Sequence, residues 1–111
     1  MYATIPQTYA FGPQVVLSSL STSTSTLIHF TRPLNDRTGV WFNAPASNTA
    51  IVSVALIDGD AADFDRNAVL DLTPGEKRLF FVKEGQPLYA FSKSPGQELV
   101  SYEVVVERLR S

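Results

Sequence analysis

The chain contains no cysteine, and this absence removes several kinds of chemistry at once. Without cysteine there is no disulfide framework, no thiolate nucleophile and no cysteine-based zinc site. Charged residues are also scarce: they make up 18% of the 111 residues, and the net charge is -2. A weakly negative chain has no long-range attraction for phosphate backbones or anionic lipid, so we expect it to bind neither nucleic acid nor a membrane.

Signatures of catalysis are missing as well. The sequence has a single histidine, His29, and no G-x-S-x-G elbow that would supply a nucleophile for it to activate. Neither glycine-rich phosphate-binding pattern, G-x-G-x-x-G or G-x-x-x-x-G-K, occurs. We therefore predict a non-enzymatic protein that has no catalytic residue and uses no cofactor.

The sequence is rich in short apolar stretches separated by turn residues. Apolar residues make up 44% of the chain, enough for one core at this length. Pro74-Gly75 and Pro95-Gly96 fit the middle of type II turns. Alternation and β-branched residues predict strands at 15–20, 26–31, 39–42, 50–57, 68–72, 77–82, 88–92 and 100–107. These features predict an all-β fold, an antiparallel β-sandwich or jelly roll of about eight strands.

Two of these strands and one connection have distinct patterns. Segment 50–57 is apolar on both faces, which predicts a central strand covered on two sides. In segment 100–107, Val100, Tyr102 and Val104 alternate with Ser101 and Glu103, a pattern typical of a half-buried antiparallel strand. The hydroxyl-rich run 18–26 suits a solvated connection, with a contact ridge as the alternative.

The first thirteen residues stand apart from the sandwich. We predict two parts, an extended N-terminal arm at 1–13 and a β-sandwich domain at 14–111. The arm suits a segment that lays large side chains on a neighbouring protein. The alternative is an arm that folds back on its own core. We predict four partner-binding residues in it: Tyr2, Ile5, Tyr9 and Phe11.

One cluster has the composition of a metal site. Four carboxylates within eight residues could supply oxygen ligands for calcium: Asp58, Asp60, Asp63 and Asp65. The spacing does not match an EF-hand loop, because Val69 stands where the bidentate glutamate belongs. The alternative is a loop in which the aspartates cap backbone N–H groups while Arg66 offsets their repulsion. We predict no metal site, and calcium binding by this loop stays open.

Aromatic residues indicate both core and surface. The pair Phe80-Phe81 puts one ring on each face of its strand, so at least one belongs to the core, and the other is either an interface residue or covered by the second layer. An exposed Trp41 together with Tyr89 could stack on sugar rings, although buried aromatics are the commoner finding.

Four segments carry a family resemblance: NTAIVSV at 48–54, LDLTPGE at 70–76, GQPLYAFS at 85–92 and VSYEVVVE at 100–107. Together they resemble small β-sandwich structural proteins of tailed bacteriophages, over roughly residues 48–110. The resemblance rests on turns and strands and carries over no site residue.

The resemblance implies a virion structural protein, assembled in the host cytoplasm. As a capsid decoration (cement) protein it would bind and stabilise the capsid shell, as a homo-oligomer (trimer or dimer). Its partners would be the major capsid protein or other virion subunits. The alternative function is a carbohydrate- or receptor-binding module of a tail or fibre, with Trp41 as its first candidate residue.

Overall fold

A computed structural model describes residues 7–11, 14–30 and 38–108 of the chain, and the side chains of 14–30 and 38–104. The described residues form nine strands and one helical turn, which comprises the 3-10 helix η1 (Ala61–Asp63) and the α-helix α1 (Phe64–Asn67). The strands are β1 (Gln7–Phe11), β2 (Val15–Leu17), β3 (Thr26–Leu27), β4 (Thr38–Asn43), β5 (Val52–Ala55), β6 (Ala68–Leu72), β7 (Lys77–Phe81), β8 (Tyr89–Ser92) and β9 (Leu99–Arg108).

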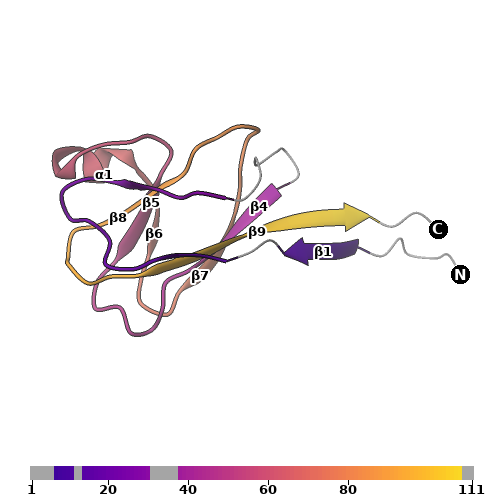
Figure 1. The fold of residues 1–111 in the computed structure, drawn as a ribbon, viewed down its shortest axis with the longest axis horizontal. Coiled ribbons are helices and arrows are strands. Elements are labelled where there is room, and N and C mark those ends of the chain that lie inside the picture. Colours follow the sequence, from indigo (N-terminus) through magenta and orange to yellow (C-terminus); the bar gives the residue numbers. More distant parts are fainter. Residues whose placement is uncertain (1–6, 12–13, 31–37, 109–111) are drawn as a thin grey trace, which may run out of the picture.

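The strands form two antiparallel sheets that face each other (Figure 1). The five-stranded sheet has the order β1-β9-β4-β7, and β2 also pairs with β9, while the four-stranded sheet has the order β3-β8-β5-β6. From β3 to β9, each strand lies in the opposite sheet from the strand before it, except that β5 and β6 are neighbours in the same sheet; this is the connectivity of a jelly roll. The predicted all-β sandwich is confirmed. All eight predicted strands are present, and β1 is an additional one.

The main core lies between the two sheets. It is built from alternate residues of facing strands, among them Val40 and Phe42 of β4 and Val52 and Val54 of β5. A second, smaller cluster lies on the other side of the four-stranded sheet, where Ala55 and Phe91 pack under Phe64 of α1. The rings of Phe64 and Phe91 are stacked with centroids 4.0 Å apart. Strand β5 is therefore buried on both faces, as its sequence predicted.

Strand β9 is oriented opposite to what its alternation implies. Ser101 pairs with Phe42 and Glu103 with Val40, so both polar side chains lie on the core side of the sheet, where they are 0% and 2% exposed. Val100 and Tyr102 point to the outer side instead. The alternation showed that the two faces differ, but pairing with β4 decides which face is turned inward.

The connections follow their turn residues. The backbone N–H of Glu76 donates to the carbonyl of Thr73 at 2.9 Å, and Gly75 has φ 85°, as the type II turn at Pro74-Gly75 requires. Between β2 and β3 the hydroxyl-rich run is mostly exposed, and the Ser21 hydroxyl accepts from the N–H groups of Ser23 and Thr24, both at 3.2 Å. This run is a solvated connection closed by its own hydroxyls.

Two buried amides join the loops at one end of the sandwich. The side-chain oxygen of Gln97 accepts from the backbone N–H of Thr49 at 2.8 Å and of Ala50 at 3.0 Å. The Asn48 side chain donates to the carbonyl of Glu98 at 2.8 Å and accepts from its N–H at 2.9 Å. The loop before β5 is thereby fixed to the turn before β9, across the two sheets.

Candidate interaction surfaces

The N-terminal strand lies along the last strand of its own chain. Strand β1 pairs with the end of β9, so that Tyr9 is opposite Val106 and Phe11 is opposite Val104. This segment of the five-stranded sheet, residues 7–11 with 104–108, extends beyond the other strands, with Val104 and Val105 at its near end also paired with β4; it is called here the distal ribbon (Figure 1). Of the four predicted arm residues, Tyr9 and Phe11 thus lie in a strand, whereas Tyr2 and Ile5 lie outside the described residues. Their role in partner binding stays a prediction.

The outer side of the five-stranded sheet is apolar. Trp41 of β4 lies between Tyr102 of β9 and Leu79 of β7 in the register of the sheet. Phe81, at the end of the edge strand β7, is 63% exposed, and Val16 of β2, on the same side, is 51% exposed. We call this surface the apolar face and define it by Val16, Trp41, Leu79, Phe81, Val100 and Tyr102.

The side chains of β7 lean over their neighbour on this face. A Cβ atom placed on Gly39 would lie 2.9 Å from Leu79 Cδ1 and 3.4 Å from Phe81 Cε1, so the glycine leaves the space that these two side chains occupy. Phe80, the other member of the aromatic pair, packs against the main core. The expectation that at least one of the two rings belongs to the core is confirmed, and Phe81 is exposed, so an interface role for it stays a prediction.

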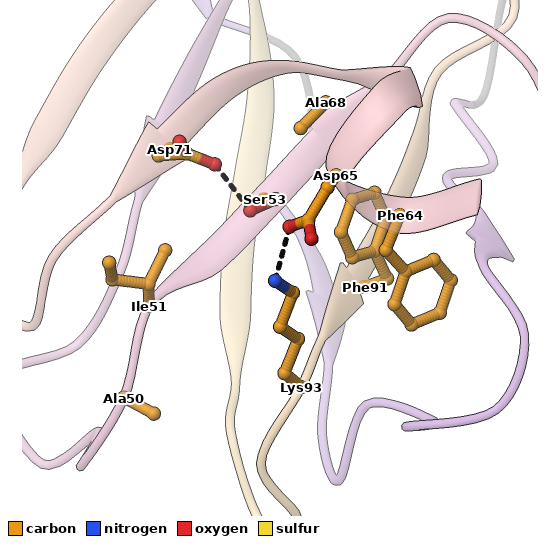
Figure 2. Close-up of a pocket in the computed structure, with 9 residues that line it drawn as sticks. All are labelled: Ala50, Ile51, Ser53, Phe64, Asp65, Ala68, Asp71, Phe91 and Lys93. Atoms are coloured by element: carbon orange, nitrogen blue, oxygen red, sulfur yellow. Dashed lines mark hydrogen bonds and ion pairs between the residues drawn. The ribbon is translucent and has the colours of Figure 1, made fainter. Parts of the chain in front are cut away.

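The opposite side of the molecule carries a concave site, called here the hollow. It lies on the outer side of the four-stranded sheet beside α1, has a volume of about 230 Å³, and is lined by Ala50, Ile51, Ser53, Phe64, Asp65, Ala68, Asp71, Phe91 and Lys93 (Figure 2). The Ser53 hydroxyl donates to Asp71 at 2.6 Å, and Lys93 forms an ion pair with Asp65. The stacked Phe64 and Phe91 rings form one wall, so the hollow has an apolar wall and a charged rim.

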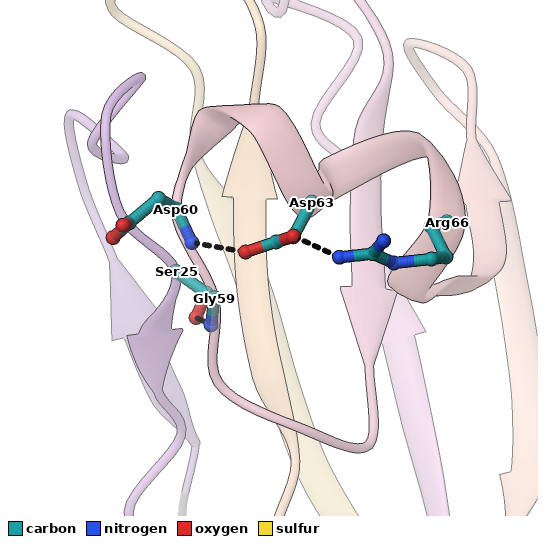
Figure 3. Close-up of polar contacts among 5 residues, drawn as sticks. All are labelled: Ser25, Gly59, Asp60, Asp63 and Arg66. Carbon is teal, nitrogen blue, oxygen red and sulfur yellow. Dashed lines mark hydrogen bonds and ion pairs between the residues drawn. The ribbon is translucent and has the colours of Figure 1, made fainter.

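The four clustered aspartates do not converge on one point. Asp58 accepts from the Ser25 hydroxyl at 2.5 Å and from the Gly59 N–H at 2.9 Å. Asp63 accepts from the Asp60 N–H at 3.4 Å and pairs with Arg66, while the Asp60 carboxylate points away from that of Asp63 (Figure 3). The aspartates therefore accept from backbone N–H groups, and Arg66 offsets part of their negative charge, as expected if the cluster is not a metal site. The segment is helical over η1 and α1, however, where a loop was expected.

No metal-binding arrangement is formed in the part of the chain that the structure describes. Within it, no three side chains of histidine, aspartate or glutamate gather closely enough to hold a metal ion. Asp65, the fourth member of the cluster, is directed to Lys93 at the hollow.

The predicted sugar-stacking pair is not brought together. Trp41 lies on the outer side of the five-stranded sheet, whereas Tyr89 is in β8 of the other sheet and packs near Phe64 and Phe91. A single platform of Trp41 with Tyr89 is therefore wrong, because the sandwich separates the two rings. His29 is exposed after β3 and, as expected of an outward-facing residue, takes no part in the core.

Sequence reasoning missed the apolar face and the hollow. The residues of each surface come from strands that are distant in the sequence, and no local pattern links them. The signal that was available is the exposed side of the Phe80-Phe81 pair, together with the apolar half of β9.

The fold defines a class, an eight-stranded jelly roll with an added N-terminal strand. In the search against family models none matches the chain, and no curated protein matches it either. The chain is similar in structure to a solved chain from work described as "Bacillus endospore appendages form a novel family of disulfide-linked pili". The TM-score is 0.52 with 12% sequence identity, covering 99% of this chain and 96% of the other, which is a likeness of fold.

A membrane-crossing helix is not found in residues 7–11, 14–30 and 38–108: none of their helices has the length and apolar character that crossing requires.

Proposed function

We propose that this chain is a non-enzymatic structural subunit that works by binding protein surfaces, including copies of itself. The observation that carries the proposal is the apolar face, where the apolar side chains of Phe81 and Val16 are exposed to solvent on one side of the five-stranded sheet. A contiguous apolar surface on a folded domain marks an interaction site more often than chance exposure does.

One further feature supports the proposal. The fold likeness to a chain described as part of disulfide-linked pili provides a precedent for this fold in an assembled appendage. Because the present chain has no cysteine, however, its own copies could not be joined by disulfides. Assembly would depend on packed surfaces, many of which act together to give high avidity from modest single contacts.

The setting we propose in particular is capsid decoration on a tailed bacteriophage, with the major capsid protein as the partner. The segments that resemble phage structural proteins occupy β5, the β6–β7 turn, β8 and β9, so they span both sheets of the jelly roll. A decoration protein would need a rigid domain with one surface that binds the shell. The jelly roll would be the rigid domain, and the apolar face would be the binding surface.

Sedimentation velocity over a range of concentrations tests the general proposal, together with co-sedimentation on purified capsid shells. We expect oligomers whose size grows with concentration, or saturable binding to the shells, and the same result with and without a reducing agent. A chain that stays monomeric at about 1 mM and does not bind the shells would contradict the proposal. Its dissociation constant would then be above about 1 mM, and a binding free energy weaker than ~4 kcal/mol is too small to hold an assembly together.

If the chain forms oligomers but does not bind the shells, the proposed structural role stands and the proposal of capsid decoration is overturned. Electron microscopy of the concentrated protein then distinguishes closed particles from filaments.

A further inference from the structure

We propose that two copies of this chain pack with the apolar face of one against the hollow of the next. This inference rests on the proposed structural role and specifies its interface. The two surfaces lie on opposite sides of the sandwich, because one is the outer side of the five-stranded sheet and the other the outer side of the four-stranded sheet.

Charge favours this pairing over two apolar faces packed together. Lys77, opposite Asn43 in the register, lies on the outer side of β7 at the border of the apolar face. Two such faces in contact would place two lysines in one interface, with no carboxylate among the residues that define the face. The hollow offers the opposite sign, since its lining has two carboxylates, Asp65 and Asp71, against the single ammonium of Lys93. Complementary charge across an interface favours correct partners and disfavours like-charged ones.

Shape favours the same pairing. Phe81 is the most exposed large apolar side chain among those that the structure describes, at 63%. The hollow, at about 230 Å³, is smaller than the roughly 300–1,000 Å³ typical of pockets for drug-sized ligands. Its apolar wall of Phe64 and Phe91, and the exposed Ile51 on the opposite side of the hollow, suit an inserted aromatic side chain (Figure 2). An aromatic anchor that fills a pocket is the usual centre of a protein interface.

The geometry of the contact determines what it builds. A contact between two different surfaces of the same chain is heterologous, so each copy keeps one free surface of each kind. Further copies can then add at both ends, giving a ring if the rotation closes and an open filament if it does not.

The test is a charge exchange between the two surfaces, measured by sedimentation velocity on the full chain. Lys77→Glu and Asp71→Lys should each weaken self-association about tenfold or more, because each places like charges across the contact. An equimolar mixture of the two variants should associate nearly as well as the wild type. In the mixture, Glu at 77 meets Lys at 71, and the unchanged Lys77 of one variant meets the unchanged Asp71 of the other.

Matched controls separate this contact from general effects. Asp71 accepts a hydrogen bond from the Ser53 hydroxyl at 2.6 Å, and Asp58, outside the hollow, accepts one from the Ser25 hydroxyl at 2.5 Å. Asp58→Lys makes the same change of charge and should leave association unchanged. Phe81→Ser should weaken association about tenfold or more, whereas Ile57→Ser, at a loop position 59% exposed, should not. Thermal melts of every variant establish that each is folded before its association is compared.

The outcomes separate the inference from the proposed function. Oligomers that are insensitive to Lys77→Glu, Asp71→Lys and Phe81→Ser would overturn the inferred contact while the structural role stands. Loss of association in Phe81→Ser, with both Lys77→Glu and Asp71→Lys unaffected, would indicate apolar faces packed together and would also overturn the inferred contact. A wild-type chain that never associates and binds no shell would overturn both.

Discussion

At the scale of single residues, β7 and β4 carry aromatic rings that differ in their surroundings. Phe42 is fully buried in the core between the sheets, whereas Phe81 lies on the apolar face with most of its surface in solvent. A ring of the first kind stabilises the fold, because its burial removes apolar surface from water. A ring of the second kind contributes little to the isolated chain and is available to a partner.

This difference predicts a large effect of alanine substitution on stability at Phe42 and a small one at Phe81. Phe42→Ala should lower the free energy of unfolding by about 3–5 kcal/mol, because it leaves a cavity in a packed core. Phe81→Ala should change it by about 0.5 kcal/mol or less, as expected for an exposed position. Urea denaturation of dilute protein measures both, and an equally large loss in Phe81→Ala would mean that its ring belongs to the folded body.

Glu76 gives a second residue-scale prediction, in pH dependence. The backbone N–H of Thr73 donates to the carboxylate of Glu76 at 3.0 Å. This hydrogen bond, together with a second one from Arg78, holds the pKa of Glu76 below its ordinary value of 4.5, although desolvation of the carboxylate opposes the shift. A native state with the lowered pKa binds a proton less readily than the unfolded chain. The stability that Glu76 contributes is therefore present above pH 4.5 and lost as the pH falls through the native pKa.

We expect the wild type to have a higher melting temperature than Glu76→Gln at pH 7. The difference between the two melting temperatures should disappear as the pH is lowered below 4.5. Melting temperatures of both proteins across pH 3–8 give the comparison. A gap that stays constant over this range would mean that the carboxylate charge contributes nothing to the turn.

At the scale of elements, the loops before β5 and β9 depend on one buried side chain. Gln97 is 1% exposed, and its amide serves Thr49, Ala50 and Pro95. Gln97→Leu keeps the volume but removes four hydrogen bonds: those accepted from the N–H groups of Thr49 and Ala50, and those donated to the Thr49 hydroxyl and the Pro95 carbonyl. We expect it to cost about 2–4 kcal/mol, since each of the lost hydrogen bonds contributes roughly 0.5–1.5 kcal/mol.

The matched control is Gln86→Leu. That side chain also donates to backbone carbonyls, of Leu56 and Pro87, but it is only partly buried, so its loss should cost about 1 kcal/mol or less. Chemical denaturation of the two variants compares them, and equal costs would contradict the role assigned to Gln97.

At the scale of the whole molecule, the distal ribbon is separable from the sandwich. Strand β1 pairs only with β9 among the described strands, and the eight remaining strands form the complete jelly roll. Removal of residues 1–13 should therefore leave a cooperative thermal transition and a β-type circular dichroism spectrum. If the arm anchors a partner as its sequence predicts, self-association or shell binding should fall about tenfold or more.

The full-length chain with Tyr9→Ser and Phe11→Ser is the control for this truncation, since it keeps the backbone of β1 but removes its rings. A truncated protein that binds as tightly as the intact chain would exclude the arm as an anchor.

The fold class, the approximate positions of eight strands and the turns at Gly75 and Gly96 could be predicted from the amino-acid sequence, because they depend on local alternation and on backbone conformations that few residues adopt. The burial of β5 on both faces could be predicted in the same way. Three features depend on how the strands pair: the side of β9 that faces the core, the position of β1, and the sets of distant residues that form the apolar face and the hollow. They could not be predicted because strand pairing joins segments far apart in the chain, and a period of two is the same for either choice of face.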